Sequence, residues 1–213
     1  MKYLIGIDEA GRGPLAGPVS VGAIMVPMNF DFSLADGARD SKKMTEKARE
    51  ELYARIHEMQ ENGLLKYAVS FSAATIIDSR GIVPAIKSAL KRCLEKLEAD
   101  PGECEIRLDG SLYAPKQFTS QTTIIRGDDS EPVISMASIM AKVTRDRYMK
   151  KQARTYPAYA FDEHVGYGTS KHRLAIRSLG LSPLHRKSFC SRVLAGEIEA
   201  ETEEILQNRG ISV

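Results

Sequence analysis

Several acidic residues of this chain lie where a short apolar segment runs into a glycine. They are Asp8, Glu9, Asp109 and Asp128. Carboxylates packed side by side repel one another unless cations neutralise them. Oxygen ligands without His or Cys favour Mg²⁺ or Mn²⁺ over zinc. Two such ions, about 4 Å apart, can activate a water molecule and stabilise the leaving oxygen of a phosphodiester. The acids therefore predict metal-dependent phosphodiester hydrolysis.

Each acid also has a simpler interpretation, because an aspartate at the end of a strand is commonly a turn or helix-cap residue. Three strand ends of the same kind, one with a double acid, favour a shared site over separate turns. Spacing alone does not separate Asp128 from Asp129 as the ligand at the third strand end. Asp146 is better explained as an ion-paired residue of a helix.

The glycine-rich segment after Glu9 has a competing interpretation. Residues 11–16, Gly-Arg-Gly-Pro-Leu-Ala, match the dinucleotide-binding pattern G-x-G-x-x-A after a strand. That pattern needs a helix to follow, with its N-terminus facing the pyrophosphate. Here Pro14 and Pro18 bracket the segment and a β-prone stretch follows, while Asp8 would place negative charge beside the phosphates. We therefore reject a nucleotide cofactor at this turn.

The elements that must position the acids follow from the hydrophobic periodicity. Strands are expected at residues 2–8, 18–26, 64–72, 105–109 and 122–126, and helices at 46–59, 84–99, 132–151, 170–179 and 196–207. The early strands are hairpin-connected neighbours, and the later ones alternate with helices. This order predicts an α/β fold with a central mixed sheet flanked by helices. Three strand ends would then bring the acids to one edge of the sheet.

Composition fits one globular domain, which we expect over residues 1–193, with an acidic helical tail over residues 194–213. The net charge is only +2, but residues 164–192 carry six Lys or Arg and no Asp or Glu. Such a basic block suggests a polyanion such as nucleic acid, although a solvated basic face would have the same composition. His57 and His172 are expected to lie in solvent.

The sequence also bounds the compartment. No apolar stretch approaches the roughly 20 residues of a membrane helix, and an acid at position 8 leaves no secretion signal. Three cysteines without Cys-x-x-Cys spacing argue against a disulfide framework or a zinc–thiolate site. We therefore expect a cytoplasmic protein that has no contact with membranes.

The order of these motifs resembles the ribonuclease HII family. Residues 6–19, Gly-Ile-Asp-Glu-Ala-Gly-Arg-Gly-Pro-Leu-Ala-Gly-Pro-Val, are similar to the signature with which that family begins. Further blocks follow in the family's order: Asp40-Ser41-Lys42-Lys43, Asp109-Gly110, Arg126-Gly127-Asp128, residues 137–146, Gly166-Tyr167-Gly168-Thr169 and residues 183–189. Together these blocks cover about residues 3–190 of the chain.

The resemblance implies a ribonuclease H-like fold, with a C-terminal helical extension, and an endonuclease that hydrolyses the RNA strand of RNA–DNA hybrids. It also implies incision on the 5′ side of a single ribonucleotide in duplex DNA, leaving 3′-hydroxyl and 5′-phosphate ends. The catalytic and metal-binding acids would be Asp8, Glu9, Asp109 and Asp128. Asp128 is chosen because the family's acid follows a basic-Gly pair. Mg²⁺ or Mn²⁺ is the implied cofactor, as two ions when substrate is bound.

The resemblance also implies how substrate is recognised. The backbone of Gly11-Arg12-Gly13 would approach the ribose 2′-hydroxyl, which distinguishes RNA from DNA. Tyr167 would stack on the sugar of the next nucleotide. Phosphate contacts would come from Lys42, Lys43 and Arg186.

The chain departs from the family's pattern at several points. Val165 stands where many members carry lysine, so one phosphate contact is expected to be missing. Residues 205–213 lack the aromatic pair of a sliding-clamp motif, so clamp tethering is not expected. We also expect a monomer. The N-terminal substrate-binding domain of ribonuclease HIII is not expected either.

Two other functions remain open from the sequence. One is a different nuclease of the same fold, such as a resolvase, which would cleave branched DNA. The other is a non-catalytic hybrid-binding protein that uses the basic block 164–192 alone.

Overall fold

The computed structural model of the chain describes residues 1–37, 44–110 and 112–196. These residues form two compact units. The first consists of Met1–Arg12 and Pro18–Tyr148, and the second of Gly13–Gly17 together with the chain from Met149 onward. A five-residue segment between two strands of the first unit therefore belongs to the second.

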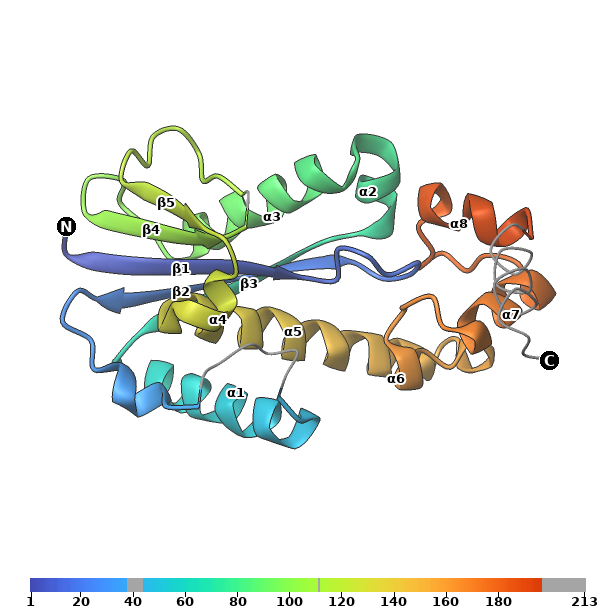
Figure 1. Cartoon of the computed structure of the whole chain (residues 1–213), viewed down its shortest axis with the longest axis horizontal. Helices are drawn as coiled ribbons and strands as arrows, with labels where there is room; N and C mark the ends of the chain where they lie inside the picture. The colour runs from blue at the N-terminus through green and yellow to red at the C-terminus, as the bar shows by residue number, and fades with distance from the viewer. Residues whose placement is uncertain (38–43, 111, 197–213) are drawn as a thin grey trace, which may run out of the picture. The chain divides into compact units, whose positions relative to one another are not determined.

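The first unit is built on a five-stranded sheet in the order β3-β2-β1-β4-β5 (Figure 1). The strands are β1 (Tyr3–Ala10), β2 (Val19–Pro27), β3 (Lys66–Ser72), β4 (Cys104–Asp109) and β5 (Gln121–Ile124). The first three strands are antiparallel neighbours, whereas β4 and β5 continue the sheet parallel to β1. The predicted mixed sheet of an α/β fold is confirmed.

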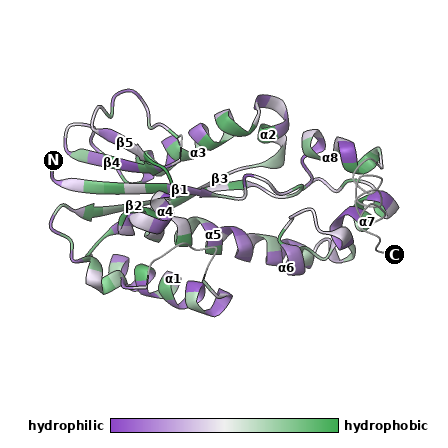
Figure 2. Cartoon of the chain, in the orientation of Figure 1, coloured by the Kyte–Doolittle hydropathy of each residue, from purple (hydrophilic) through white to green (hydrophobic). Residues whose placement is uncertain are grey.

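Helices cover both faces of this sheet (Figure 1). They are α1 (Glu46–Glu61), α2 (Ala74–Arg80), α3 (Ile82–Lys96), α4 (Gly127–Ser130) and α5 (Pro132–Ala153), with a short 3₁₀ turn at Phe32–Ala35. On one face α3 packs against β2 and β3. On the other, α5 and α1 enclose an apolar core with Leu4, Ile24 and Val26. β2 is buried from Val19 to Val26 and is largely apolar in Figure 2.

The close approach of α5 explains two glycines in the central strands. A Cβ atom on Gly6 would lie 2.3 Å from the carbonyl oxygen of Val133, and one on Gly22 would lie 2.3 Å from that of Ala137. Since alternate residues of a strand face the same side, Asp8 shares the α5 face with Gly6. The sheet and α5 together therefore fix the depth at which Asp8 lies.

The second unit is helical. It contains a 3₁₀ turn at Pro157–Tyr159, α6 (Phe161–His164), α7 (Ser170–Leu179) and α8 (Lys187–Leu194). The Gly13–Gly17 segment is bound between its loops: the Leu15 N–H donates to the Gly166 carbonyl at 2.9 Å, and the Gly17 N–H donates to the Leu184 carbonyl at 2.8 Å. No helix among the described residues has the length and apolarity to cross a membrane.

Most predicted elements are present, with shifted ends. The helix expected from residue 84 begins at Ile82, and Pro84 occupies its first turn, where a missing N–H costs little. The helices α2, α4, α6 and α8 were not predicted. The helix expected at 196–207, and with it the proposed tail, falls almost entirely outside the described residues.

Candidate active site

Two of the predicted acids lie at the same level of adjacent parallel strands. Ile7 of β1 pairs with Leu108 of β4, and Asp8 and Asp109 are the next residues. Asp109 ends its strand, as predicted. Asp8 does not, because the pairing of β1 with β2 continues to Ala10. The sheet therefore brings these two carboxylates together by register rather than by two strand ends.

Asp8 is an acid in an unfavourable environment. Its side chain is only 4% exposed. Burial raises its pKa well above the ordinary range, and the negative charges of Glu9 and Asp109 raise it further. A hydrogen bond with the Ser138 side chain acts in the opposite direction. The Asp8 Oδ1 atom also accepts the Glu9 backbone N–H at 2.7 Å. The negative charges of Glu9 and Asp109 near Asp8 are therefore not fully neutralised by the chain's own groups.

Glu9 belongs to the opposite face of β1, because neighbouring side chains of a strand alternate. The strand remains extended through this residue, so the expected departure from extended geometry comes only afterwards. Its Oε1 atom pairs with the Arg12 guanidinium at 3.1 Å. The charge of Glu9 therefore acts on Asp8. The ion pair with Arg12 also connects Glu9 to the glycine-rich turn.

Asp128 reaches the acids on a short helix rather than at a strand end. β5 stops at Ile124, Arg126 has a left-handed backbone with φ of 55°, and α4 begins at Gly127. The Gly127 N–H donates to Asp109 Oδ1 at 2.7 Å, which joins the start of α4 to the end of β4. Asp128 is 6% exposed and its backbone carbonyl accepts the Ser135 hydroxyl, whereas Asp129 is exposed.

The donor set of these acids fits a hard divalent cation. Within residues 1–37, 44–110 and 112–196, no group of three His, Cys, Asp or Glu side chains is arranged so that it could hold a metal ion as it stands. All donors here are carboxylate oxygens, which Mg²⁺ and Mn²⁺ prefer. The raised pKa of Asp8 marks a place where a cation would relieve repulsion. The type of donor atom therefore fits such a cation. The carboxylates would have to move closer together to bind it.

The turn after Glu9 is held by an arginine that sequence reasoning did not single out. Gly11 has a φ of +85°, and a Cβ atom there would lie 2.0 Å from Nε of Arg145. Arg145 is fully buried, and its Nε donates to the Pro18 carbonyl at 2.9 Å. Next to it on α5, Asp146 forms the predicted ion pair, 2.9 Å from Lys142. Only glycine at position 11 leaves room for the Arg145 side chain.

In the second unit, Tyr167 is 41% exposed, and histidines bind the backbone around it. The Ser182 N–H donates to His185 Nδ1 at 2.9 Å, so the proton of neutral His185 is on Nε2. That proton points to His172 Nε2 at 3.0 Å, and His172 therefore donates from Nδ1 to the Tyr167 carbonyl at 2.9 Å. His164 accepts the Gly166 N–H and its ring stacks on His172 with centroids 4.3 Å apart.

This histidine cluster corrects the expectation of a solvated His172. His172 is fully buried and His185 is 3% exposed. Burial lowers the pKa of each to about 4, and it also lowers the pKa of His164. Within the basic block, these rings are neutral core residues, whereas His57 on α1 is about half exposed as expected. The burial of these histidines was not predictable from the sequence, because they lie among Lys and Arg residues that are usually exposed.

Arg186 also differs from the expected surface phosphate contact. Its side chain is fully buried, its Nε donates to the Gly17 carbonyl at 2.9 Å, and its guanidinium lies 5.2 Å from the centre of the Phe189 ring. It holds the Gly13–Gly17 segment in the second unit. Gly13 itself is exposed, with nothing within 4 Å of a Cβ position. Lys42 and Lys43 lie outside the described residues.

Comparisons with known proteins show the family and the fold of the chain. A family model described as Ribonuclease HII matches residues 5–192. A ribonuclease HII of Desulfitobacterium hafniense is 42% identical over 187 residues, which cover 88% of this chain and 68% of that protein. The crystal structure of ribonuclease H2 from Pyrococcus horikoshii matches with a TM-score of 0.72 at 25% identity, over 92% of this chain and 98% of that one. Bst ribonuclease HIII, in complex with Mn²⁺, shares the fold with a TM-score of 0.67 at 21% identity, over 92% and 70% of the two chains.

Proposed function

The chain belongs to the ribonuclease HII family and is a metal-dependent nuclease, and from this premise we propose that it cuts the RNA strand of RNA–DNA hybrids and incises duplex DNA 5′ of single ribonucleotides. The observation that carries the proposal is the placement of the acids. Asp8 and Asp109 lie level on adjacent parallel strands, and the Gly127 N–H bond to Asp109 draws the turn of Asp128 to the same point.

We assign Asp8, Glu9, Asp109 and Asp128 as the ligands of Mg²⁺ or Mn²⁺, with two ions when substrate is bound. Bound there, such ions lower the pKa of a water molecule and neutralise charge on the leaving oxygen. Attack of that water on the phosphate in line with the leaving group would give 3′-hydroxyl and 5′-phosphate ends. The chain's own part is positional: β1 and β4 fix two ligands, and the burial of Asp8 and Asp128 keeps bulk water away from them.

Ribose recognition is assigned to the turn after Glu9. The backbone of Gly11-Arg12-Gly13 would meet the 2′-hydroxyl, a group that can both donate and accept. Arg145 supports this assignment because it fills the space beside Gly11 and fixes that backbone. Tyr167 would stack on the sugar of the following nucleotide. Arg186 would act by holding Gly17 rather than by touching phosphate.

The remaining assignments are also proposals. We propose that residues 1–193 act as the catalytic domain of a monomer, and that Lys42 and Lys43 contact phosphate. Cys93, Cys104 and Cys190 are free thiols, which fits a reducing compartment such as the cytoplasm.

The decisive experiment uses a labelled DNA duplex with one ribonucleotide, an all-DNA control, and Mg²⁺, Mn²⁺ or EDTA. We expect incision 5′ of the ribonucleotide, no cleavage of the control and no activity in EDTA. Asp109→Asn should abolish incision while the duplex still binds. A hybrid-binding protein would bind equally well and never cleave, and cleavage of branched all-DNA substrates would indicate a resolvase instead.

A matched pair of variants tests the ligand assignment at the third position. Asp128→Asn and Asp129→Asn make the same change in neighbouring residues, one buried and one exposed. Asp128→Asn should reduce incision by at least about a hundredfold, because a ligand oxygen of the cation is replaced by a neutral amide. Asp129→Asn should leave it within about twofold. The opposite order would move the assignment to Asp129.

A further inference from the structure

A pocket of the first unit, separate from the acids, has the character of a phosphate-binding surface. It has a volume of about 740 Å³ and opens between α3 and the connection from β4 to β5. Lys87 and Lys91 of α3 line it from one side, and Tyr113, Lys116 and Gln121 line it from the other. No Asp or Glu is among the described residues that line it. We call it the α3 pocket.

The positive charge of this pocket is not neutralised by the chain. Lys87 and Lys91 are exposed and four residues apart on α3, so their side chains share one face. Neither Lys87 nor Lys116 forms an ion pair with any residue that the structure describes. Lys91 pairs with Glu95 at 3.6 Å, but both side chains are largely exposed, and such pairs contribute little. Three ammonium groups therefore remain available to an anion.

Tyr113 adds a large aromatic surface beside these lysines. It is 59% exposed, which is unusual for a ring of this size. The backbone on which it sits is fixed: the Ala114 N–H donates to Gln121 Oε1 at 2.8 Å, and Gln121 Nε2 donates to the Phe118 carbonyl at 2.7 Å. Tyrosine commonly contacts the phosphates and sugars of nucleic acids. The ring and the lysines thus suit one nucleotide backbone together.

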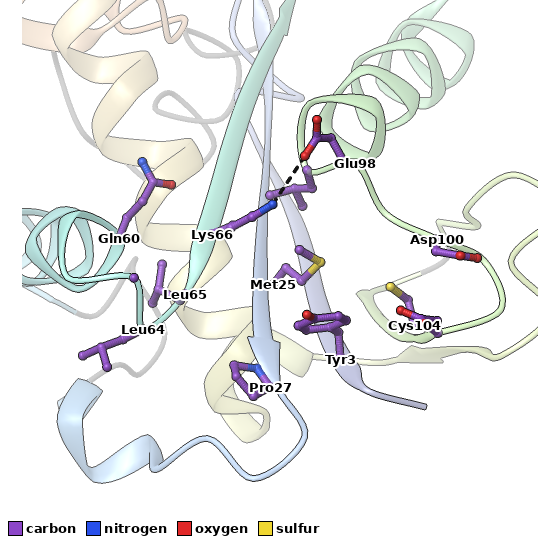
Figure 3. A pocket seen from close by; sticks show the side chains of 13 residues that line it. Tyr3, Met25, Pro27, Gln60, Leu64, Leu65, Lys66, Glu98, Asp100 and Cys104 are labelled. Carbon is purple, nitrogen blue, oxygen red and sulfur yellow. Dashed lines mark hydrogen bonds and ion pairs between the residues drawn. The ribbon is translucent and has the colours of Figure 1, made fainter.

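A second cavity of similar size on this unit is not lined mainly by basic residues. It measures about 670 Å³, lies at the N-terminal end of β1 beside Tyr3, and is lined by Lys66 together with Glu98, Asp100 and Glu103 (Figure 3). Lys66 pairs with Glu98 at 3.5 Å there. Its excess of acids does not suit a polyanion, so the two cavities differ in the sign of their charge.

The sheet register gives the offset between the α3 pocket and the acids along the strands, although the pocket lies on the α3 face of the sheet and Asp8 on the α5 face. Gln121, in the lining, pairs with Ile106 of β4, three residues before Asp109. At about 3.3 Å per residue, the two lie about 10 Å apart along the strand. Phosphates of one DNA strand are about 3.4 Å apart along the duplex axis. For a duplex that runs along the strands, this offset corresponds to about three base pairs.

We propose that the α3 pocket binds the sugar-phosphate backbone of one substrate strand, a few base pairs away from the cleaved bond. Lys87 and Lys116 contact phosphates, and Tyr113 packs against a sugar. This inference rests on the proposed function, because it extends the same substrate beyond the acids. The contact is independent of base sequence, so it lengthens the footprint on the duplex and adds affinity without altering the choice of ribonucleotide.

The test measures duplex binding by fluorescence anisotropy in the Asp109→Asn background, across a series of salt concentrations. Three duplexes of equal length carry the ribonucleotide at the centre or close to either end. Lys87→Ala/Lys116→Ala is compared with Lys2→Ala/Lys66→Ala, which removes the same charge at the other end of β1, where both lysines pair with glutamates. A further pair, Tyr113→Ala and Tyr113→Phe, separates the ring from its hydroxyl.

With the central ribonucleotide, the pocket variant should bind about tenfold more weakly, and its salt slope should fall by about 2 for two lost phosphate contacts. The Lys2/Lys66 control should change by less than about twofold. With the ribonucleotide near one of the two ends, wild type and pocket variant should bind alike, because no duplex reaches the pocket. Tyr113→Ala should weaken binding several-fold more than Tyr113→Phe.

Equal losses for all three duplexes, or no larger loss than in the control, would overturn the proposal. Equal competition by millimolar AMP or inorganic phosphate against all three duplexes, lost in the pocket variant, would indicate a small-ligand site and overturn it as well. Failure of the proposed function is a different result: the wild-type protein would bind these duplexes but incise none of them, whatever the α3 pocket contributes to affinity.

Discussion

Acidification should destabilise the second unit through its buried histidines. The pKa of His172 and of His185 is about 4 in the folded protein, against about 6.5 in an unfolded chain. As the pH falls below 6.5, these histidines bind protons in the unfolded chain but remain neutral in the folded protein. The free energy of unfolding is therefore unaffected by these groups above pH 6.5 and falls between pH 6.5 and 4.

The size of the effect follows from those values. Each pKa unit is worth about 1.4 kcal/mol, so one histidine should cost about 2 kcal/mol at pH 5 and about 3 kcal/mol at pH 4. The two rings share a hydrogen bond. Protonation of either ring therefore disrupts the series of hydrogen bonds that runs from the Ser182 N–H through His185 and His172 to the Tyr167 carbonyl. At pH 5 both rings are still largely neutral in the folded protein, so the two losses nearly add, to about 4 kcal/mol.

The assay is amide hydrogen exchange of residues 159–186, measured at pH values from 7.5 to 5 and corrected for the intrinsic rate. Protection should fall by roughly a thousandfold over this range in the wild-type protein, which is the equivalent of about 4 kcal/mol for the two rings. His172→Gln removes one of the two titrating rings and should reduce the fall to roughly thirtyfold, because His185 still titrates. His57→Gln, on the exposed face of α1, should leave the pH dependence as in the wild-type protein. An unchanged pH dependence in His172→Gln would refute the reasoning.

Three further predictions concern the glycines, the buried arginine and the cation. Gly22→Ala should destabilise the protein by about 1–3 kcal/mol in urea unfolding, because its Cβ meets the Ala137 carbonyl; Gly13→Ala, with open space around it, should leave stability unchanged and reduce ribonucleotide incision. Arg145→Met should cost about 2 kcal/mol by the same measurement, since a charged hydrogen bond to the Pro18 carbonyl is lost. Mn²⁺ or Mg²⁺ should raise the thermal unfolding temperature, because the cation relieves repulsion around Asp8, and EDTA should reverse this rise. The Asp109→Asn variant should lose most of the shift. An equal shift in that variant would contradict the assignment.

The arrangement of the sheet and the acids was predictable from the sequence because it depends on local patterns. Apolar segments that end in an acid and a glycine gave the strands, and the alternation of strands with helices gave the mixed sheet. The strand end at Asp8 was wrong by two residues, because pairing with β2 continues past the acid. Hydrophobic pattern gives no information on where a ladder of hydrogen bonds stops.

The buried charged and polar residues were not predictable. Arg145 and Arg186 belong to a type that is mostly exposed, and each is buried because a distant segment supplies its partner. His172 is buried among neighbours closer in the chain, the Tyr167 carbonyl and the His185 ring. Arg145 bonds to a carbonyl 127 residues away, and Arg186 to one 169 residues away. The basic block 164–192 therefore contains a structural arginine, Arg186, and neutral histidines, which its composition did not indicate. Such pairings depend on the folded topology, which local composition does not report.

The membership of Gly13–Gly17 in the second unit has a consequence for folding during synthesis. These residues leave the ribosome early, but the side chain that binds the Gly17 carbonyl comes 169 residues later. At about 5–20 residues per second, they wait roughly 10–30 s for it. The strands on either side can pair in that time, whereas the second unit forms last. A chain that stops before Arg186 would present an assembled sheet with the second unit incomplete, and that unit would be the part that a nascent-chain protease cuts first.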